Sequence, residues 1–243
     1  LAGIALAAYY GAAYLLYDAG STAVMMPYFA LTPELTSDYD ERTSLTSYRM
    51  FFSIPMLAPF ILWREPGNMA IRSKAMIFPL LAGVFTALDL ALWTTALSFT
   101  TAANATLLGN TAPLWVALGT WLILKQKLTN TFWRGLAVTL AGAALIMGTD
   151  FLLHPRFGVG DVMAIFTGFF YGGYFLFTEK SRVHFSPILH IWIVGIGAGI
   201  TLLIINLIMQ NPLTGYDTRT WIVFLSTALV SQLIGYMALA YAL

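Results

Sequence analysis

The sequence has no cysteine and very little charge. Its 243 residues include 12 Lys and Arg, 11 Asp and Glu, and no Cys. Without cysteine the chain can form no disulfide, no thiolate metal site and no cysteine nucleophile. A net charge of +1 provides no basic field to attract phosphates, which argues against a nucleic-acid partner.

Catalytic and nucleotide-binding motifs are missing as well. The apolar runs contain no Ser/His/Asp set, no HExxH motif, no acidic metal cluster and no GxxxxGK[ST] loop. We therefore expect no enzyme, no cofactor and no bound metal. An ATP-driven pump is not expected either, unless a separate subunit supplies the ATPase.

Apolar residues are what the sequence has in abundance. They make up 59% of the chain, charged residues only 9%, and the mean hydropathy is +0.77. Soluble domains carry roughly a quarter charged residues. A chain this apolar requires the lipid bilayer as its solvent, so we predict a multi-pass protein of the cell membrane.

The apolar runs predict an all-α fold, a polytopic transmembrane helix bundle. A helix needs about 20 apolar residues to cross a bilayer. Eight runs approach or exceed this length, which predicts about eight spans. The first is too long for one straight helix and contains Asp18, Gly20 and Pro27, so a kink or break is expected there. The runs cover residues 1–31, 47–63, 76–98, 104–124, 132–149, 158–178, 186–209 and 220–242.

Basic residues predict the orientation of these spans. Most Lys and Arg fall in alternate loops, and positively charged loops tend to stay in the cytoplasm. We therefore predict that these loops and both ends of the chain face the cytoplasm, with the bacterial inner membrane as the location. The residues concerned are Arg64, Arg72, Lys74, Lys125, Lys127, Arg134, Lys180 and Arg182.

From about residue 54 onward, the sequence resembles the drug/metabolite transporter superfamily with EamA-type repeats. The residues that carry the resemblance are "LDLALWTTALSFTTAANATLLGNTAPLWVALGTWLILKQKLTNTFWRGLAVTLAGAALIMG" at 88–148 and "GVGDVMAIFTGFFYGGYFLFTEK" at 158–180. It implies inverted repeats and a secondary transporter that moves a small metabolite or drug by alternating access. The chain departs from the family pattern at Lys125-Gln126-Lys127, where a Glu is usual after the fourth helix.

The first 53 residues resemble a different family. "YDAGSTAVMMPYFALTPELTSDYDERTSLTSYRMFFSI" at 17–54 is similar to the glycoside–pentoside–hexuronide:cation symporters, the melibiose-carrier family. This resemblance implies an alternative function, cation-coupled sugar symport. It also predicts a chimeric or fused sequence with a join near 48–54.

The two resemblances divide the chain into three expected parts. Residues 1–53 form the symporter-like segment, 54–150 the first EamA-like repeat and 151–243 the second. "ALWTTAL", ending at Leu97, reads like "YMALAYAL", ending at Leu243, which predicts that the second repeat is truncated at the C-terminus by roughly two helices.

Two carboxylates fall well inside predicted spans, Asp18 and Asp89, whereas Asp161 lies at the edge of one. A charge within a span is costly and therefore marks a functional residue by default. We predict a proton- or cation-coupling role for Asp89, with Asp18 as the second choice. The alternative for Asp89 is a buried, protonated side chain that hydrogen-bonds a neighbouring Ser or Thr.

The fourth predicted span carries several polar and aromatic residues. Asn104, Thr111 and Trp115 are spaced by seven and four residues, which places them on one face of a continuous helix, while Asn110 lies on another. Pro113 can free a backbone carbonyl to face a cavity. The alternative is that the asparagines hold helices together by interhelical hydrogen bonds.

Further pathway residues are expected on the third, sixth and last spans. Their alternative role is helix packing, which is the role we predict for the small-xxx-small pairs Gly168/Gly172 and Gly195/Gly199. The expected partners are the lipid bilayer, a small solute and a proton or cation, and a homodimer is left open. The further pathway residues are Trp93, Tyr171, Tyr174, Gln232 and Tyr236, with Thr167 and Thr178 on the same stripe as the two tyrosines.

Overall fold

The structure is a computed structural model that describes residues 39–64, 74–153, 158–211 and 213–216, together with 218, 221, 222, 225 and 228. All of its regular elements in these ranges are helical. Residues 39–243 form one compact unit, and residues 1–38 form another. The predicted span 1–31 and most of the predicted span 220–242, and with them Asp18, Gln232 and Tyr236, lie outside the described residues.

Helices occupy the other six predicted spans. They are α2 (Tyr39–Arg64), α3 (Ile77–Ala96), α4 (Ala102–Gly109), α5 (Ala112–Leu122), α6 (Asn130–Leu153), α7 (Val159–Arg182) and α8 (Pro187–Met209), with a short 3₁₀ helix, Lys74–Met76, before α3. α2 begins at Tyr39, earlier than the predicted 47, and runs unbroken through 48–54.

Three helical segments of the described chain are long and apolar enough to cross a membrane, judged by length and composition alone. They are Lys74–Ala96, Val159–Arg182 and Pro187–Met209. These segments match the predicted runs 76–98, 158–178 and 186–209 closely, because an uninterrupted apolar run of this length has no other stable state in lipid.

Helix starts are fixed by local hydrogen bonds. Ser186 precedes Pro187, and its hydroxyl accepts the Leu189 N–H at 3.3 Å. At the start of α7, the Asp161 carboxylate accepts the Gly158 N–H at 2.9 Å and the Thr100 hydroxyl at 2.5 Å. Asp161 is 4% exposed, and these two bonds satisfy it as a cap. They also join α7 to the turn between α3 and α4.

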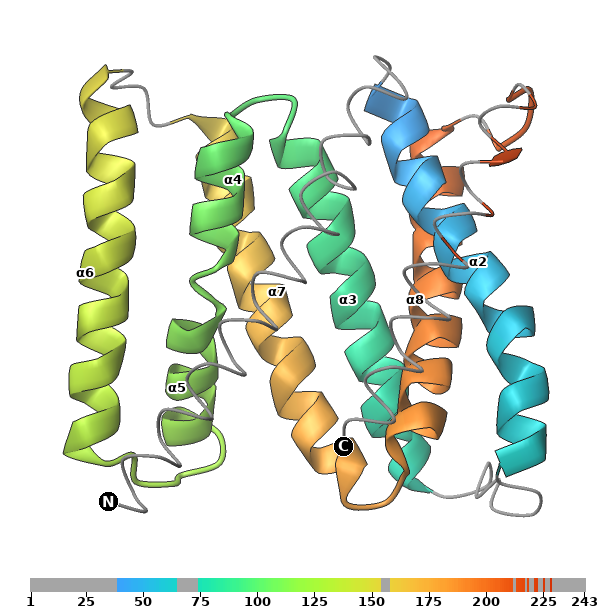
Figure 1. The fold of residues 1–243 in the computed structure, drawn as a ribbon, viewed down its shortest axis with the longest axis horizontal. Coiled ribbons are helices and arrows are strands. Elements are labelled where there is room, and N and C mark those ends of the chain that lie inside the picture. The colour runs from blue at the N-terminus through green and yellow to red at the C-terminus, as the bar shows by residue number, and fades with distance from the viewer. Residues whose placement is uncertain are drawn as a thin grey trace, which may run out of the picture. The chain divides into compact units, whose positions relative to one another are not determined.

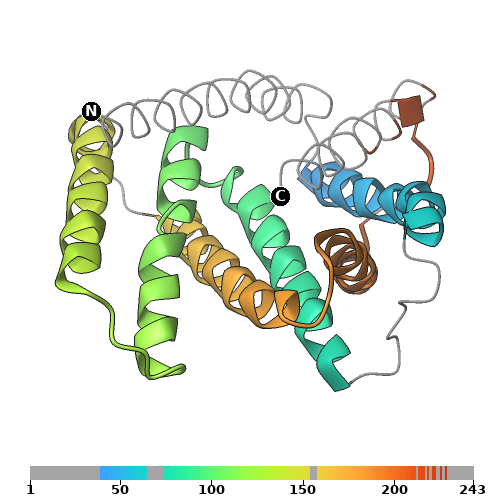
Figure 2. The same ribbon diagram turned by 60° about the horizontal axis from the view of Figure 1, so that its bottom comes forward.

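The helices pack in a definite order, which Figures 1 and 2 show. α3 lies between α7 and α8, α8 also packs against α2, and α7 also packs against α4 and α5. α6 lies beyond α4 and α5, and most of its described side chains are exposed. α7 is therefore the helix that links α3 to the α4–α5 pair.

Close backbone contact joins α3 to α8. A methyl group at Gly83 would lie 2.5 Å from the Val194 carbonyl oxygen and 2.9 Å from the Gly197 Cα, so only glycine fits. Further along the bundle, the fully buried Asn206 of α8 donates to the Ser47 hydroxyl of α2 at 2.5 Å. Asn206 thus joins two helices, as expected of an isolated asparagine in a span.

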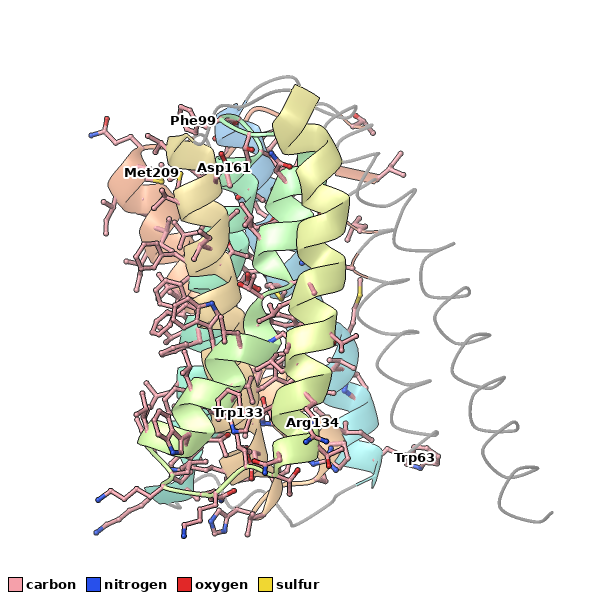
Figure 3. The ribbon with its side chains drawn as sticks, turned by 90° about the vertical axis from the view of Figure 1, so that its left-hand side faces the viewer. Trp63, Phe99, Trp133, Arg134, Asp161 and Met209 are labelled. Carbon is pink, nitrogen blue, oxygen red and sulfur yellow. The ribbon has the colours of Figure 1, made fainter. Side chains whose placement is uncertain are left out.

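The ends of the helices segregate by charge. Figure 3 shows Trp63, Trp133 and Arg134 at one end of the helices and Phe99, Asp161 and Met209 at the other. The loop with Lys125 and Lys127 precedes α6, at the same end as Arg134. This arrangement is the charge asymmetry on which the predicted cytoplasmic side depends, and the side itself stays a prediction.

Candidate functional site

The predicted span 104–124 is two helices rather than one. α4 ends at Gly109, α5 begins at Ala112, and Asn110 and Thr111 form a turn between them, here called the break. Pro113, the second residue of α5, has no N–H to give to the Gly109 carbonyl four residues earlier. The helix therefore cannot continue regularly, and this carbonyl loses its intrahelical donor.

A small hydrogen-bond network orders the break. The Trp115 indole Nε1–H donates to the Thr111 hydroxyl at 3.3 Å. That hydroxyl in turn donates to the Leu108 carbonyl at 2.6 Å, and the Thr111 backbone N–H reaches the same carbonyl at 3.2 Å. Two of the predicted pathway residues, Thr111 and Trp115, are thus brought into contact.

α7 covers the break with two glycines. A methyl group at Gly168 would meet the Thr111 hydroxyl and would lie 3.0 Å from the Gly109 carbonyl oxygen. A methyl group at Gly172 would lie 2.8 Å from the Trp115 Cβ. The predicted packing role of this glycine pair is therefore confirmed, and its partner is the break. The second pair, Gly195/Gly199, makes looser contact with α2.

Thr167 presents a polar group beside the break. It is 4% exposed, and its hydroxyl has no hydrogen-bond partner. Its methyl group would lie 3.3 Å from a Cβ placed at Gly109. A buried hydroxyl without a partner costs about 1–3 kcal/mol, so its presence requires an explanation, and a functional role is one.

One face of α3 turns toward α4 and α7. Phe85 packs its ring against Phe170 and Phe177 of α7, with centroids 5.5 and 5.1 Å apart. Trp93 packs on the buried cluster that includes Leu108. Asp89 lies between Phe85 and Trp93 at a spacing of four residues, so it shares their face.

The threonines of α3 form hydrogen bonds to backbone carbonyls of their own helix. The Thr86 hydroxyl donates to the Ala82 carbonyl at 2.9 Å, and the Thr95 hydroxyl to the Ala91 carbonyl at 2.6 Å. The Thr94 hydroxyl donates to the Leu90 carbonyl at 2.9 Å.

The other described pathway residues are more scattered. Tyr171 and Tyr174 stack on each other on α7, with ring centroids 6.0 Å apart. Asn110 is exposed at the break, and Asn104 lies in the first turn of α4, where Thr101 caps its N–H. The prediction that Asn104 and Thr111 share a face assumed one continuous helix. That assumption is wrong, because α4 ends at Gly109, before Thr111.

Sequence reasoning placed Thr167 on a stripe of α7 without singling it out. Its position next to Gly168 could have indicated its location, because a residue that neighbours a close-packing glycine lies near the same partner helix. Gly109 and Gly83 were missed because a glycine that allows close approach looks, in a single sequence, like any other glycine.

These features define a multi-pass membrane protein of apolar helices with one helix broken in mid-course. The model of the EamA-like transporter family matches residues 11–148, more than half of the chain. The chain belongs to the EamA-like transporter family. The match begins well before residue 54, runs through the predicted join at 48–54 and ends before the predicted second repeat.

Two curated relatives agree with parts of the chain. An uncharacterized transporter of Archaeoglobus fulgidus is 28% identical over 145 residues, which are 59% of this chain and 50% of that protein. An uncharacterized symporter of Synechocystis is 52% identical over 46 residues, which are 19% of this chain and 8% of that protein. The chain thus spans about half the length of the first relative. No solved structure matches it.

Proposed function

We propose that this protein is a secondary transporter that carries a small metabolite or drug past the break between α4 and α5. The observation that carries the proposal is the break itself. Irregular backbone at membrane depth is stable only where protein buries it or where it lines a watery cavity. Asn110 is exposed at this turn, whereas the flanking Gly109 and Ala112 are buried.

Specific roles follow for the surrounding residues. Asp89 would couple transport to a proton or cation, and Thr111 and Trp115 would contact the solute at the break. The full proposed pathway comprises Asp89, Trp93, Asn104, Asn110, Thr111, Trp115, Tyr171, Tyr174, Gln232 and Tyr236, with Asp18 as a second coupling carboxylate. Alternating access would move the repeat at 54–150 against the repeat at 151–243 in a bacterial inner membrane.

Pro113→Ala is the variant that tests this function. Alanine supplies the backbone N–H donor that the Gly109 carbonyl lacks, so α4 and α5 can join into one regular helix. Proteoliposomes loaded with a mixture of unlabelled amines, amino acids and sugars should take up labelled tracers by counterflow. We expect Pro113→Ala to fold normally and to lose about tenfold or more of this uptake.

The control is Pro55→Ala, which removes a proline inside α2, away from the break. It should keep the uptake of the parent protein. If the parent shows no counterflow above protein-free liposomes, the protein is not a transporter of these solutes. Full uptake by Pro113→Ala would mean that the break is not on the path.

A further inference from the structure

The charges around the break are strongly one-sided. Within the described lengths of α3, α4, α5 and α7, Asp89 is the one charged residue away from the helix ends. The nearest basic residues in sequence stand before α3, after α5 and in the last turn of α7. Arg49 lies on α2, which packs mainly against α8. The described lengths of these four helices therefore carry one carboxyl group and no cation away from their ends, and Asp89 lies one helical turn from Trp93, whose ring lies near Gly109.

This distribution selects against an anionic solute. An ion moved into a low-dielectric interior without a counterion loses several kcal/mol of solvation. A carboxylate or phosphate beside the break would have no described Lys or Arg to compensate it, and Asp89 would repel it. A cationic solute would instead gain a partner of opposite charge.

The uncharged groups at the break are hydrogen-bond acceptors. Pro113 leaves the Gly109 carbonyl without its helical donor, and the buried Thr167 hydroxyl beside Gly109 has no partner. A primary ammonium group carries three N–H donors and no acceptor. The Gly109 carbonyl and the Thr167 hydroxyl are therefore acceptors open to such a group, and Asp89 supplies the negative charge on α3.

Two indole rings complete this arrangement. The Trp93 ring reaches within 4.0 Å of a Cβ placed at Gly109, and the Trp115 indole is held at Thr111 by its N–H. Tryptophan has the aromatic face that attracts cations most strongly, and it equally packs against an apolar or aromatic body.

We infer that the solute is an apolar amine, bound as its ammonium form at the break between α4 and α5, beside Thr167 of α7. This inference rests on the proposed transport function. It goes beyond that function because a broken helix alone would serve a neutral or anionic solute as well.

Three probes with one phenyl body test the charge requirement. They are phenethylamine, a cation at neutral pH, the neutral 2-phenylethanol, and the anion 3-phenylpropionate. Binding is measured on the full-length protein in detergent by quenching of tryptophan fluorescence, and transport by counterflow of each labelled probe. We expect phenethylamine to bind about tenfold or more tightly than the other two, as an added ionic hydrogen bond should produce.

Thr167→Val tests the site, because valine keeps the shape of threonine and removes the hydroxyl. It should weaken phenethylamine binding by about tenfold. The matched control is Thr139→Val on α6, where the hydroxyl only bonds the Gly135 carbonyl of its own helix at 3.0 Å. Affinity for the amine should be unchanged in this control.

The outcomes separate this inference from the proposed function. Equal or tighter binding of the alcohol or the carboxylate overturns the inference, while counterflow of either probe leaves the transport function standing. An amine preference that Thr167→Val leaves intact overturns the assigned site. Counterflow of the solute mixture with no binding of phenethylamine rejects the amine class. Loss of counterflow for every solute is the separate failure of the function itself.

Discussion

Asp89→Asn is expected to abolish proton-driven accumulation of solute, while exchange of solute at equal pH persists and is weakened for an amine that loses its charged partner. A gradient of about one pH unit stores about 1.4 kcal/mol per proton, enough for roughly tenfold accumulation with one proton per solute. Asparagine keeps the size of the aspartate and part of its hydrogen bonding, but it cannot take up or release a proton. The accumulation ratio should therefore fall from about ten to about one.

The measurement uses proteoliposomes with an imposed pH gradient, in parallel with counterflow at equal pH. Glu179→Gln is the control, since it neutralises an exposed carboxylate at the end of α7. The control should accumulate solute as the parent does. If Asp89→Asn also accumulates solute fully, Asp89 is not the coupling residue, and Asp18 is the next carboxylate to test.

Gly83→Ala is expected to lower the stability of the protein markedly. The added methyl would lie 2.5 Å from the Val194 oxygen and 2.8 Å from the Ala198 nitrogen, both of them backbone atoms. Backbone cannot rotate away as a side chain can, so α3 and α8 must separate. Overpacking of this kind costs about 1–3 kcal/mol, which a thermal unfolding scan in detergent would detect as a lower Tm.

Gly142→Ala is the matched control for this substitution. No atom lies within 4 Å of a Cβ at Gly142, and the position is exposed on α6. Alanine is the better helix former, so the Tm should stay unchanged or rise slightly. An equal Tm for Gly83→Ala and the parent would contradict the close contact between α3 and α8.

The sequence predicted best those helices whose position follows from apolar composition alone. The runs 76–98, 158–178 and 186–209 are uniformly apolar, and α3, α7 and α8 match them within a few residues. The Gly168/Gly172 pair was also predicted correctly as a packing surface. Its spacing of four places both residues on one face of α7, which requires no knowledge of the partner.

The break was only half predictable. Pro113 predicted that a backbone carbonyl would lose its donor. A proline inside a span can also produce only a mild kink, and two prolines do lie within the continuous helix α2. Tertiary contact decides between these results, since Gly168 of α7 leaves room for the turn at Thr111. The bond from Asn206 to Ser47 and the contact of Gly83 with Gly197 join residues far apart in sequence, and no local pattern encodes them.

The central claim is that the break lies on a watery path for the solute. The most direct measurement is the reaction of Asn110→Cys with a charged, membrane-impermeant methanethiosulfonate, because the parent chain has no cysteine. Val138→Cys, which replaces a side chain that is 73% exposed on α6, is the lipid-facing comparison. Only a thiolate in water reacts with such a reagent. The account predicts that Asn110→Cys is modified and Val138→Cys is not, whereas resistance of both cysteines would contradict it.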